Sequence, residues 1–229
     1  MKVLELFAGS RSFSKVAEKM GMETYTTDVN DFQGIDLVKD ILDVNASDIE
    51  KEFGVPDIIW ASPPCTYFSV ASIGHHWYQN HTPKTKEAIL GVDIVAKSNS
   101  IIRYFLNQNP NLLYYIENPR GKLRKLPVMN FTLYRRTIWY CQYFSPEETV
   151  KRAKPTDIWT NDFNWIPRKE CKNGNPNCDH VAAPRGSQTG TQGLKGNYER
   201  SIVPSELCRE ILNSINIDII RGRLNDKST

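Results

Sequence analysis

The chain has 229 residues, of which 40% are hydrophobic and 24% are charged, as in ordinary soluble globular proteins. This length allows one large domain or two small ones, and no apolar run approaches the length that spans a bilayer. The five cysteines show no regular pairing, which is typical of a reducing compartment, so we expect a cytoplasmic protein without a membrane partner.

The net charge of +3 is too small to indicate a nucleic-acid partner by itself. Its distribution is uneven, because the stretch from Glu117 to Lys154 holds nine lysines and arginines against three glutamates. The local excess of six positive charges is either a solvated basic face or a phosphate-binding patch. The sequence leaves both interpretations open.

Short apolar stretches alternate with helical patterns over most of the chain. Strands are expected at Lys2 to Phe7, Glu23 to Val29, Asp57 to Ala61, Leu112 to Glu117 and Arg136 to Phe144. Helices are expected at Phe13 to Met20, from the capping pair Ser47 and Glu50 to Gly54, and from Thr82-Pro83 to about Leu106. Strands that alternate with helices predict an α/β fold with a doubly wound, mostly parallel sheet.

Four polar or turn-forming motifs fall where predicted strands end. They are Phe7-Ala8-Gly9, Asp28, Pro63-Pro64-Cys65 and Glu117-Asn118-Pro119. Ligands of such sheets bind beyond the carboxyl ends of the strands, so we expect these motifs to line one site. The two prolines cannot continue a strand and hold Cys65 rigidly at its end. The alternatives are a buried structural thiol for Cys65 and a surface carboxylate for Glu117.

From about Thr160 the sequence loses its periodicity and becomes rich in glycine, asparagine, proline and serine, which predicts a loop. A helical pattern returns at Pro204 to Ile215, and this helix should pack back on the sheet near the first strand. We therefore divide the chain into a core (1–160), a loop-rich insert (161–199), a C-terminal helix (200–217) and a tail (218–229).

The order of these motifs resembles that of the cytosine-C5 DNA methyltransferases, especially the small phage and bacterial members. The stretches that carry the resemblance are "LELFAGSRSFSKVAEKMG", Asp28, "SPPCTYFS" and "IENPRG". "KGNYERSIVP" resembles the family's final motif at Gly196, Asn197 and Pro204. The resemblance implies a Rossmann-like enzyme that uses S-adenosylmethionine (AdoMet) to methylate carbon 5 of cytosine in DNA, with RNA left open as a substrate.

The resemblance gives three residues a part in the chemistry. Cys65 would add to carbon 6 of cytosine, so that carbon 5 becomes nucleophilic enough to take a methyl group. Glu117 would protonate the ring near nitrogen 3, and Asn118 would hold its loop. Neither reactive group can reach a base inside an intact duplex, so the base must be flipped out.

On the cofactor side, the resemblance places AdoMet against the turn after the first strand. The expected contacts are Phe7, Ala8, Gly9, Ser10, Arg11, Ser12 and Pro63. Arg11 and Ser12 stand where the family usually has glycines, so they would crowd the cofactor, or Arg11 would pair with its carboxylate. Asp28 is expected to accept the ribose hydroxyls and Asp40 to contact the adenine, although Asp40 also fits a plain surface position.

The family's arginine motif, which contacts the flipped base, has two candidates. "YRRTIWYC" offers Arg135 and Arg136, and "VKRAKPTDIWTN" offers Arg152 and Lys154, which chain order favours. The candidate substrate-binding residues are Arg120, Arg136, Arg152 and Lys154.

Cys171, Cys178 and His180 form a cluster in a loop that is poor in hydrophobic residues. A structural zinc ion would stabilise such a loop, with Asp179 or the more distant Cys141 as a fourth ligand. The alternative is a set of loop thiols without a metal.

Two other functions fit parts of the sequence. "SPPC" also resembles the Ser-Pro-Pro-aromatic motif of methyltransferases that modify an exocyclic amine, N4 of cytosine or N6 of adenine, with Tyr67 or Phe68 stacking on the base. The altered Gly9-Ser10-Arg11-Ser12 turn would fit a catalytically inactive AdoMet-fold protein that binds nucleic acid.

Overall fold

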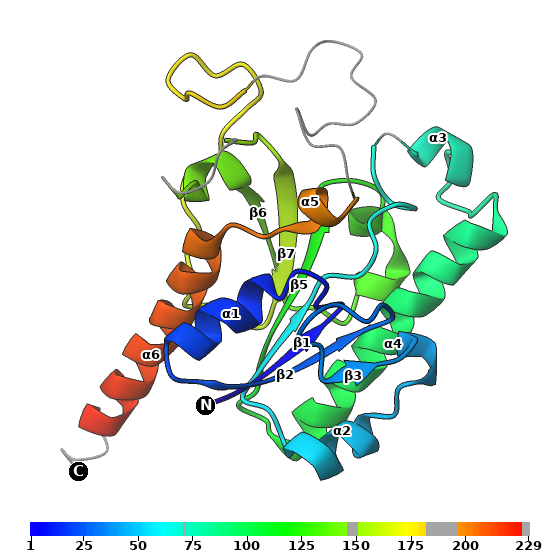
Figure 1. Cartoon of the computed structure of the whole chain (residues 1–229). Coiled ribbons are helices and arrows are strands. Elements are labelled where there is room, and N and C mark those ends of the chain that lie inside the picture. The colour runs from blue at the N-terminus through cyan, green and yellow to red at the C-terminus, as the bar shows by residue number, and fades with distance from the viewer. Residues whose placement is uncertain (71, 146–150, 182–196, 226–229) are drawn as a thin grey trace.

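A twisted sheet forms the centre of the molecule in the computed structural model (Figure 1), which describes residues 1–70, 72–145, 151–181 and 197–225. Within these residues the sheet has seven strands in the order β3-β2-β1-β4-β5-β7-β6. The strands are β1 (Lys2–Leu6), β2 (Glu23–Asp28), β3 (Leu37–Val38), β4 (Ile58–Ala61), β5 (Leu113–Pro119), β6 (Tyr134–Trp139) and β7 (Pro155–Thr160). β1 to β5 are parallel, and β7 runs antiparallel to β5 and β6. The predicted doubly wound, mostly parallel α/β fold is confirmed.

The described helices are α1 (Ser12–Lys19), α2 (Ala46–Phe53), α3 (Ile73–His76), α4 (Lys86–Gln108), α5 (Asn197–Ser201) and α6 (Ser205–Asn225). Short 3-10 turns are η1 (Ile41–Asp43), η2 (Leu123–Lys125), η3 (Pro127–Met129) and η4 (Tyr140–Tyr143). Figure 1 shows α1 and α6 on one side of the sheet and α2 and α4 on the other.

Two apolar layers hold these helices, because successive strand residues point to opposite faces and both faces are covered. One layer joins Leu4 and Ile59 to α2 and α4. The other joins Val3 and Trp60 to α1 and α6, and the ring of Phe13 stacks on Trp60 at 4.7 Å between centroids. The C-terminal helix therefore packs on the same face of the sheet as α1.

Two helices begin at other residues than those predicted. Asn45, not Ser47, precedes α2, so the Ser47 hydroxyl lies inside the helix. Thr85, not Thr82, caps α4, and its hydroxyl oxygen accepts the N–H of Ala88 at 3.2 Å. The sequence offers a threonine at both positions before α4, and Thr85 has the extended backbone and the side-chain hydrogen bond of a cap.

The C-terminal half departs from the prediction in three places. β6 ends at Trp139, and the predicted continuation to Phe144 is the 3-10 turn η4. β7 was not predicted, because it begins with a proline and lies beside a stretch without periodicity. α6 continues to Asn225, so the segment expected to be a tail from 218 is helical up to that residue.

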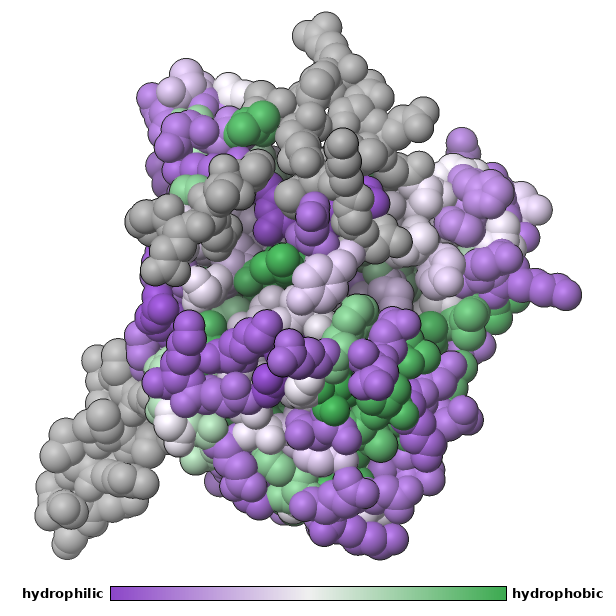
Figure 2. All heavy atoms as spheres, viewed as in Figure 1, coloured by the Kyte–Doolittle hydropathy of each residue, from purple (hydrophilic) through white to green (hydrophobic). Residues whose placement is uncertain are grey.

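The region predicted as an insert contains no helix or strand between 161 and 181, while residues 182–196, including Gly196, lie outside the described residues. None of the described helices is long and apolar enough to cross a membrane. Hydrophilic residues cover most of the face shown in Figure 2, and apolar colours gather over α4 and β3.

Candidate active site

The four strand-end motifs lie at one edge of the sheet. β2, β1, β4 and β5 are consecutive neighbours and run in the same direction, so their carboxyl ends meet there. The turn after β1, Asp28 of β2, the Pro-Pro-Cys turn after β4 and the last residues of β5 therefore surround one location. The structure therefore brings the four motifs together, and their part in a binding site stays a prediction.

Cys65 occupies a rigid turn after β4. Its carbonyl oxygen accepts the backbone N–H groups of Phe68 and Ser69, both at 3.0 Å, and its side chain is half-buried. Burial raises the pKa of the Cys65 thiol, the charge of Lys154 lowers it, and the charge of Glu117 raises it. The pKa of the thiol is raised overall, and Lys154 is the nearby cation that opposes this rise.

Glu117 is a buried carboxyl group at the end of β5, with 4% of its surface exposed. Its Oε1 accepts a hydrogen bond of 2.9 Å from the Tyr140 hydroxyl and lies 3.6 Å from the Lys154 ammonium. Burial and the neighbouring Glu117 raise the pKa of Tyr140 well above its usual value, so the phenol keeps its proton and acts as a donor. Glu117 is therefore not the surface carboxylate of the alternative interpretation.

Asn118 connects the two candidate catalytic residues. Its side chain is fully buried, and its Nδ2 donates to the carbonyl oxygen of Pro63 at 2.8 Å. The Pro-Pro-Cys turn is thereby tied directly to the end of β5, next to Glu117. A second tie follows at Lys122, whose backbone N–H donates to the carbonyl oxygen of Phe68 at 2.7 Å.

The glycine of "ENPRG" makes that second tie possible. A Cβ at Gly121 would overlap the carbonyl oxygen of Phe68, which is a backbone atom and cannot move without the turn that carries Cys65. Glycine is required here because two backbone segments approach closely, and not because the backbone angle is unusual.

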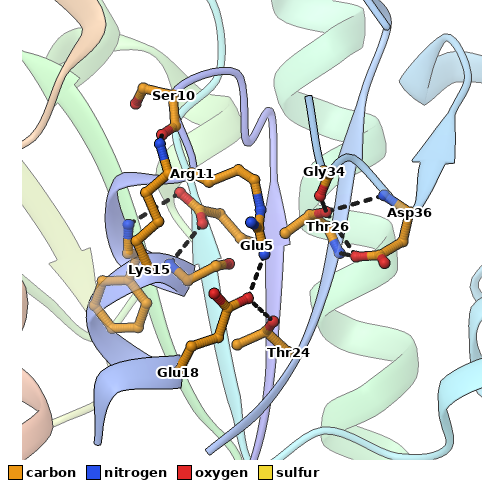
Figure 3. Close-up of polar contacts among 11 residues, drawn as sticks. Glu5, Ser10, Arg11, Lys15, Glu18, Thr24, Thr26, Gly34 and Asp36 are labelled. Atoms are coloured by element: carbon orange, nitrogen blue, oxygen red, sulfur yellow. Dashed lines mark hydrogen bonds and ion pairs between the residues drawn. The ribbon is translucent and has the colours of Figure 1, made fainter. Parts of the chain in front are cut away.

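A buried acid that the sequence analysis did not single out supports the turn after β1. Glu5 points from β1 to the start of α1, where its carboxylate accepts the N–H groups of Phe13 at 3.3 Å and Ser14 at 2.8 Å (Figure 3). Burial raises the pKa of Glu5. Because α1 has no side-chain cap of its own, Glu5 satisfies its free N–H groups. The only sequence signal was an acid inside an apolar strand.

Arg11 and Ser12, which replace the usual glycines, both form side-chain contacts with other parts of the protein. Arg11 has a left-handed backbone with φ of 53°, and its guanidinium pairs with Glu18 (Figure 3). The hydroxyl of Ser12 accepts the backbone N–H of Val203 at 3.1 Å, which joins the turn to the segment before α6. The Arg11 guanidinium is thus engaged in an internal ion pair, and its pairing with a cofactor carboxylate stays a prediction.

An open pocket of about 620 Å³ lies beside this turn. It is lined by Gly9, Arg11, Lys15, Phe32, Gln33, Gly34 and Tyr198. The Oδ2 of Asp28 accepts the N–H of Gly9 at 2.9 Å, which fixes this carboxylate at the wall of the pocket. Asp40 is exposed, lies outside the lining, and caps η1 by accepting the N–H of Leu42 at 3.0 Å.

The candidate substrate-binding bases occupy different environments. Lys154 is buried next to Glu117, and its ammonium also donates to the carbonyl oxygen of Arg200 at 3.1 Å. Arg152 is buried as well and donates to the carbonyl oxygen of Glu199 at 3.1 Å. Both side chains thus hold the α5 segment over the site, and Lys154 is the one that reaches Glu117.

The other two candidates lie beside aromatic rings. Arg136 is half-buried on β6 with its guanidinium 5.5 Å from the ring centroid of Tyr134. Arg120 is exposed beside Trp139. Several of the other basic residues, such as Arg124 and Lys151, form ion pairs within the protein. In the described part of this stretch, the exposed ones are Arg120, Lys125 and Arg135.

The predicted metal cluster is brought together with a fourth member. Cys141 from η4 joins Cys171, Cys178 and His180, and the four candidate ligand atoms lie within 4.8 Å of one another. Asp179, the other candidate for a fourth ligand, instead pairs with Lys151.

The chain was compared with protein-family models, solved structures and curated proteins. No protein-family model matches it. A SAM-dependent methyltransferase from Archaeoglobus fulgidus is a structural match at a TM-score of 0.34 and 10% identity, covering 69% of this chain and 85% of that one. The probable DNA (cytosine-5)-methyltransferase of Frog virus 3 is 27% identical, and the match covers 93% of this chain and 99% of the viral protein. The chain is thus similar over nearly its whole length to a probable DNA (cytosine-5)-methyltransferase, which confirms the family resemblance predicted from its motifs.

Proposed function

We propose that this protein transfers a methyl group from AdoMet to carbon 5 of cytosine in DNA, with Cys65 as a covalent nucleophile. The observation that carries the proposal is the hydrogen bond from Asn118 to Pro63, at 2.8 Å. This hydrogen bond holds the turn that carries the Cys65 thiol against the end of β5, which carries the buried carboxyl group of Glu117. The similarity to the viral protein supports the same reaction class.

The chemistry follows from the two side chains. The Cys65 thiolate forms a bond to carbon 6 of the flipped cytosine, and Glu117 supplies a proton at ring nitrogen 3, so that carbon 5 becomes the nucleophilic end of an enamine. AdoMet, when bound, supplies the methyl group that carbon 5 takes. Water then takes the proton from carbon 5 as the bond between carbon 6 and sulfur breaks and releases the Cys65 thiolate, and the proton on ring nitrogen 3 returns to Glu117.

Lys154 has two functions in this proposal. Its charge opposes the effect of burial, which raises the pKa of the Cys65 thiol. Its ammonium, 3.6 Å from Glu117, also supplies the cation that the family's arginine motif brings to the flipped base. Arg152 positions the neighbouring backbone by its bonds to the carbonyl oxygens of Glu199 and Ile202.

The residues beside Gly9 fit AdoMet. Each oxygen of Asp28 accepts one backbone N–H, from Gly9 and Asn30, and keeps further lone pairs for ribose hydroxyls. Phe32 and Tyr198 line the same pocket with ring centroids 5.5 Å apart, and offer an aromatic surface to the adenine. Neither ring was identified from the sequence. Phe32 follows Asp28 by four residues, a spacing that could have indicated it.

Because Glu117 is buried at the strand end, the target base must leave the duplex to reach it. The exposed basic side chains of Arg120, Lys125 and Arg135 are available to DNA phosphates on the surface. This favours DNA binding through a small number of surface charges, with the base recognised inside the site.

The direct test is a mechanism-based trap. We expect that incubation with AdoMet and a long duplex carrying 5-fluorocytosine will add the mass of the DNA covalently to the intact protein. Fluorine occupies the position of the proton that must be removed, so the bond to Cys65 cannot be released. The Cys65→Ala variant should give no adduct, whereas Cys208→Ala, which removes a buried thiol in α6, should give the same adduct as the parent.

Two other results would replace the proposal. Methylated DNA without any adduct would favour the exocyclic-amine reaction, in which Tyr67 or Phe68 stacks on the base. No AdoMet binding by calorimetric titration and no methylation would favour the inactive AdoMet-fold protein.

A further prediction concerns the position of the turn that carries Cys65. Gly121→Ala should lower methyl transfer by about 10²-fold, the cost of misplacing a reacting group by roughly 1 Å, because the new Cβ displaces the Phe68 carbonyl. AdoMet affinity should not change. Gly74→Ala is the matched control, since nothing lies within 4 Å of a Cβ added there, and equal turnover in both variants would contradict the proposed function of Gly121.

A further inference from the structure

We propose that Cys141, Cys171, Cys178 and His180 bind one structural zinc ion, which fixes the loop at 171–181 to the turn η4. The ligands come from two segments about 30 residues apart, so the ion would act as a cross-link between them. The inference concerns residues outside the proposed reaction, and its test does not depend on methyl transfer.

The arrangement of the four ligand atoms fits a tetrahedral ion. Zinc lies about 2.3 Å from thiolate sulfur and about 2.0–2.1 Å from imidazole nitrogen, so its ligand atoms are roughly 3.5–3.8 Å apart. In this structure the Cys171 Sγ and the His180 Nδ1 are 3.9 Å apart, and all four atoms lie within 4.8 Å of one another. Binding therefore requires shifts of no more than about 1 Å, and three cysteines with one histidine form a common structural zinc set.

Neighbouring amides are placed to support thiolates. The Nε2 of Gln142 lies 3.7 Å from the sulfur of Cys141 and 3.9 Å from that of Cys178. The Nδ2 of Asn175 lies 3.4 Å from the sulfur of Cys171. Such N–H donors favour the deprotonated ligands that zinc needs, as the outer partners of metal sites do.

The histidine requires one local adjustment. Its Nε2 now accepts the N–H of Gly174 at 3.2 Å. If Nδ1 binds the ion, Nε2 carries the remaining ring proton, so the Gly174 peptide must turn away. Gly174 has a positive φ of 72°, and a glycine has more backbone conformations open to it for this rotation than other residues have.

The surrounding sequence explains why this loop needs a metal. From Cys171 to His180 it has no aliphatic or aromatic residue, so it cannot form an apolar core of its own. Three of the four ligands are nevertheless buried, which indicates that the cluster itself is the centre of this small unit. The free energy of zinc binding would take the place of hydrophobic packing.

The position of the cluster connects it to the site of the proposed function, and this step rests on that proposal. Cys141 follows Tyr140, whose hydroxyl donates to Glu117 at 2.9 Å. At the other end of the loop, the N–H of Val181 donates to the carbonyl oxygen of Lys151 at 3.1 Å, next to Arg152. The ion would thus hold both segments that place charged or polar side chains beside Glu117.

The test measures zinc in the full chain, purified without chelator, by elemental analysis and native mass spectrometry. The parent protein should contain one zinc ion per chain, and Cys178→Ser and His180→Ala should lose it. Cys208→Ala and Cys65→Ser should keep the zinc ion. That result would show that loss of zinc is specific to the cysteines of the cluster. Asp179→Asn should also keep it, because Asp179 pairs with Lys151 rather than with the cluster.

If a ligand variant fails to fold, the parent protein still decides the question. Reduced, metal-free protein should take up one Co²⁺ and show the intense visible absorption of tetrahedral thiolate coordination. Failure of the parent to hold zinc or to take up Co²⁺ overturns the proposal, and so does a disulfide among the three cysteines in protein isolated under reducing conditions. A zinc-loaded protein without DNA methylation would refute only the proposed function, and an active zinc-free protein only the metal site.

Discussion

Cys65→Ser is expected to lower methyl transfer by about 10³-fold or more while leaving the fold and AdoMet binding intact. Serine has nearly the volume of cysteine, so the turn formed by the Cys65 carbonyl with Phe68 and Ser69 should persist. Its hydroxyl is scarcely ionised at neutral pH, so it cannot add to carbon 6 at a useful rate. The measurement is transfer of labelled methyl groups to DNA, with AdoMet affinity measured by calorimetry on the same samples.

Cys208→Ser provides the control, because it introduces the same atom change at a buried thiol away from the strand ends. Its turnover should stay close to that of the parent. If Cys65→Ser methylated cytosine at the parent rate, the covalent mechanism would be wrong, and transfer to an exocyclic amine would take its place.

The part of the fold set by local apolar patterns could be predicted from the sequence. β1, β2, β4 and β5 were recognisable because they are buried on both faces and end in turn-forming residues. β7 was not, because it starts with a proline, follows a run of bases and gains its stability from pairing with β5 and β6. Pairing partners that distant in sequence leave no local signal.

The same distinction applies to the site. Cys65, Glu117 and Asn118 could be predicted because each stands at a strand end in a recognisable motif. Glu5 and Tyr140 could not, since their importance comes from the atoms they meet, the N–H groups of α1 in one case and the Glu117 carboxylate in the other. A single buried acid or tyrosine in a sequence does not reveal its partner.

Arg11 shows how a departure from a family pattern can be accommodated within the protein. At the sequence level, its place in a glycine-rich turn raised the possibility of a contact with the cofactor. The structure pairs its side chain with Glu18 and gives its backbone the left-handed conformation that glycine would adopt most easily. An arginine in that conformation is tolerated because the ion pair and the Glu5 contacts with α1 hold the turn.

Glu117→Gln is expected to reduce turnover by roughly 10²–10⁴, the usual value of a positioned general acid. The Tyr140 hydroxyl and the Lys154 ammonium both face Oε1, so the amide oxygen of glutamine should take that position and direct its NH₂ group towards the base. The variant could then donate a hydrogen bond to ring nitrogen 3 but could not transfer a proton. Base binding should therefore survive and addition of Cys65 should slow.

The step that fails can be isolated, because addition of Cys65 to carbon 6 labilises the hydrogen on carbon 5. Release of tritium from DNA labelled at that position should fall in Glu117→Gln as steeply as methyl transfer does. Tyr140→Phe is the matched variant, since it keeps the carboxyl group and removes only the hydroxyl that orients it, so its loss should be clearly smaller. Equal losses in the two variants would mean that Glu117 acts only by holding its neighbours in place. If Glu117 supplies the proton, only Glu117→Gln, which lacks the carboxyl group, should stop the addition of Cys65 to carbon 6.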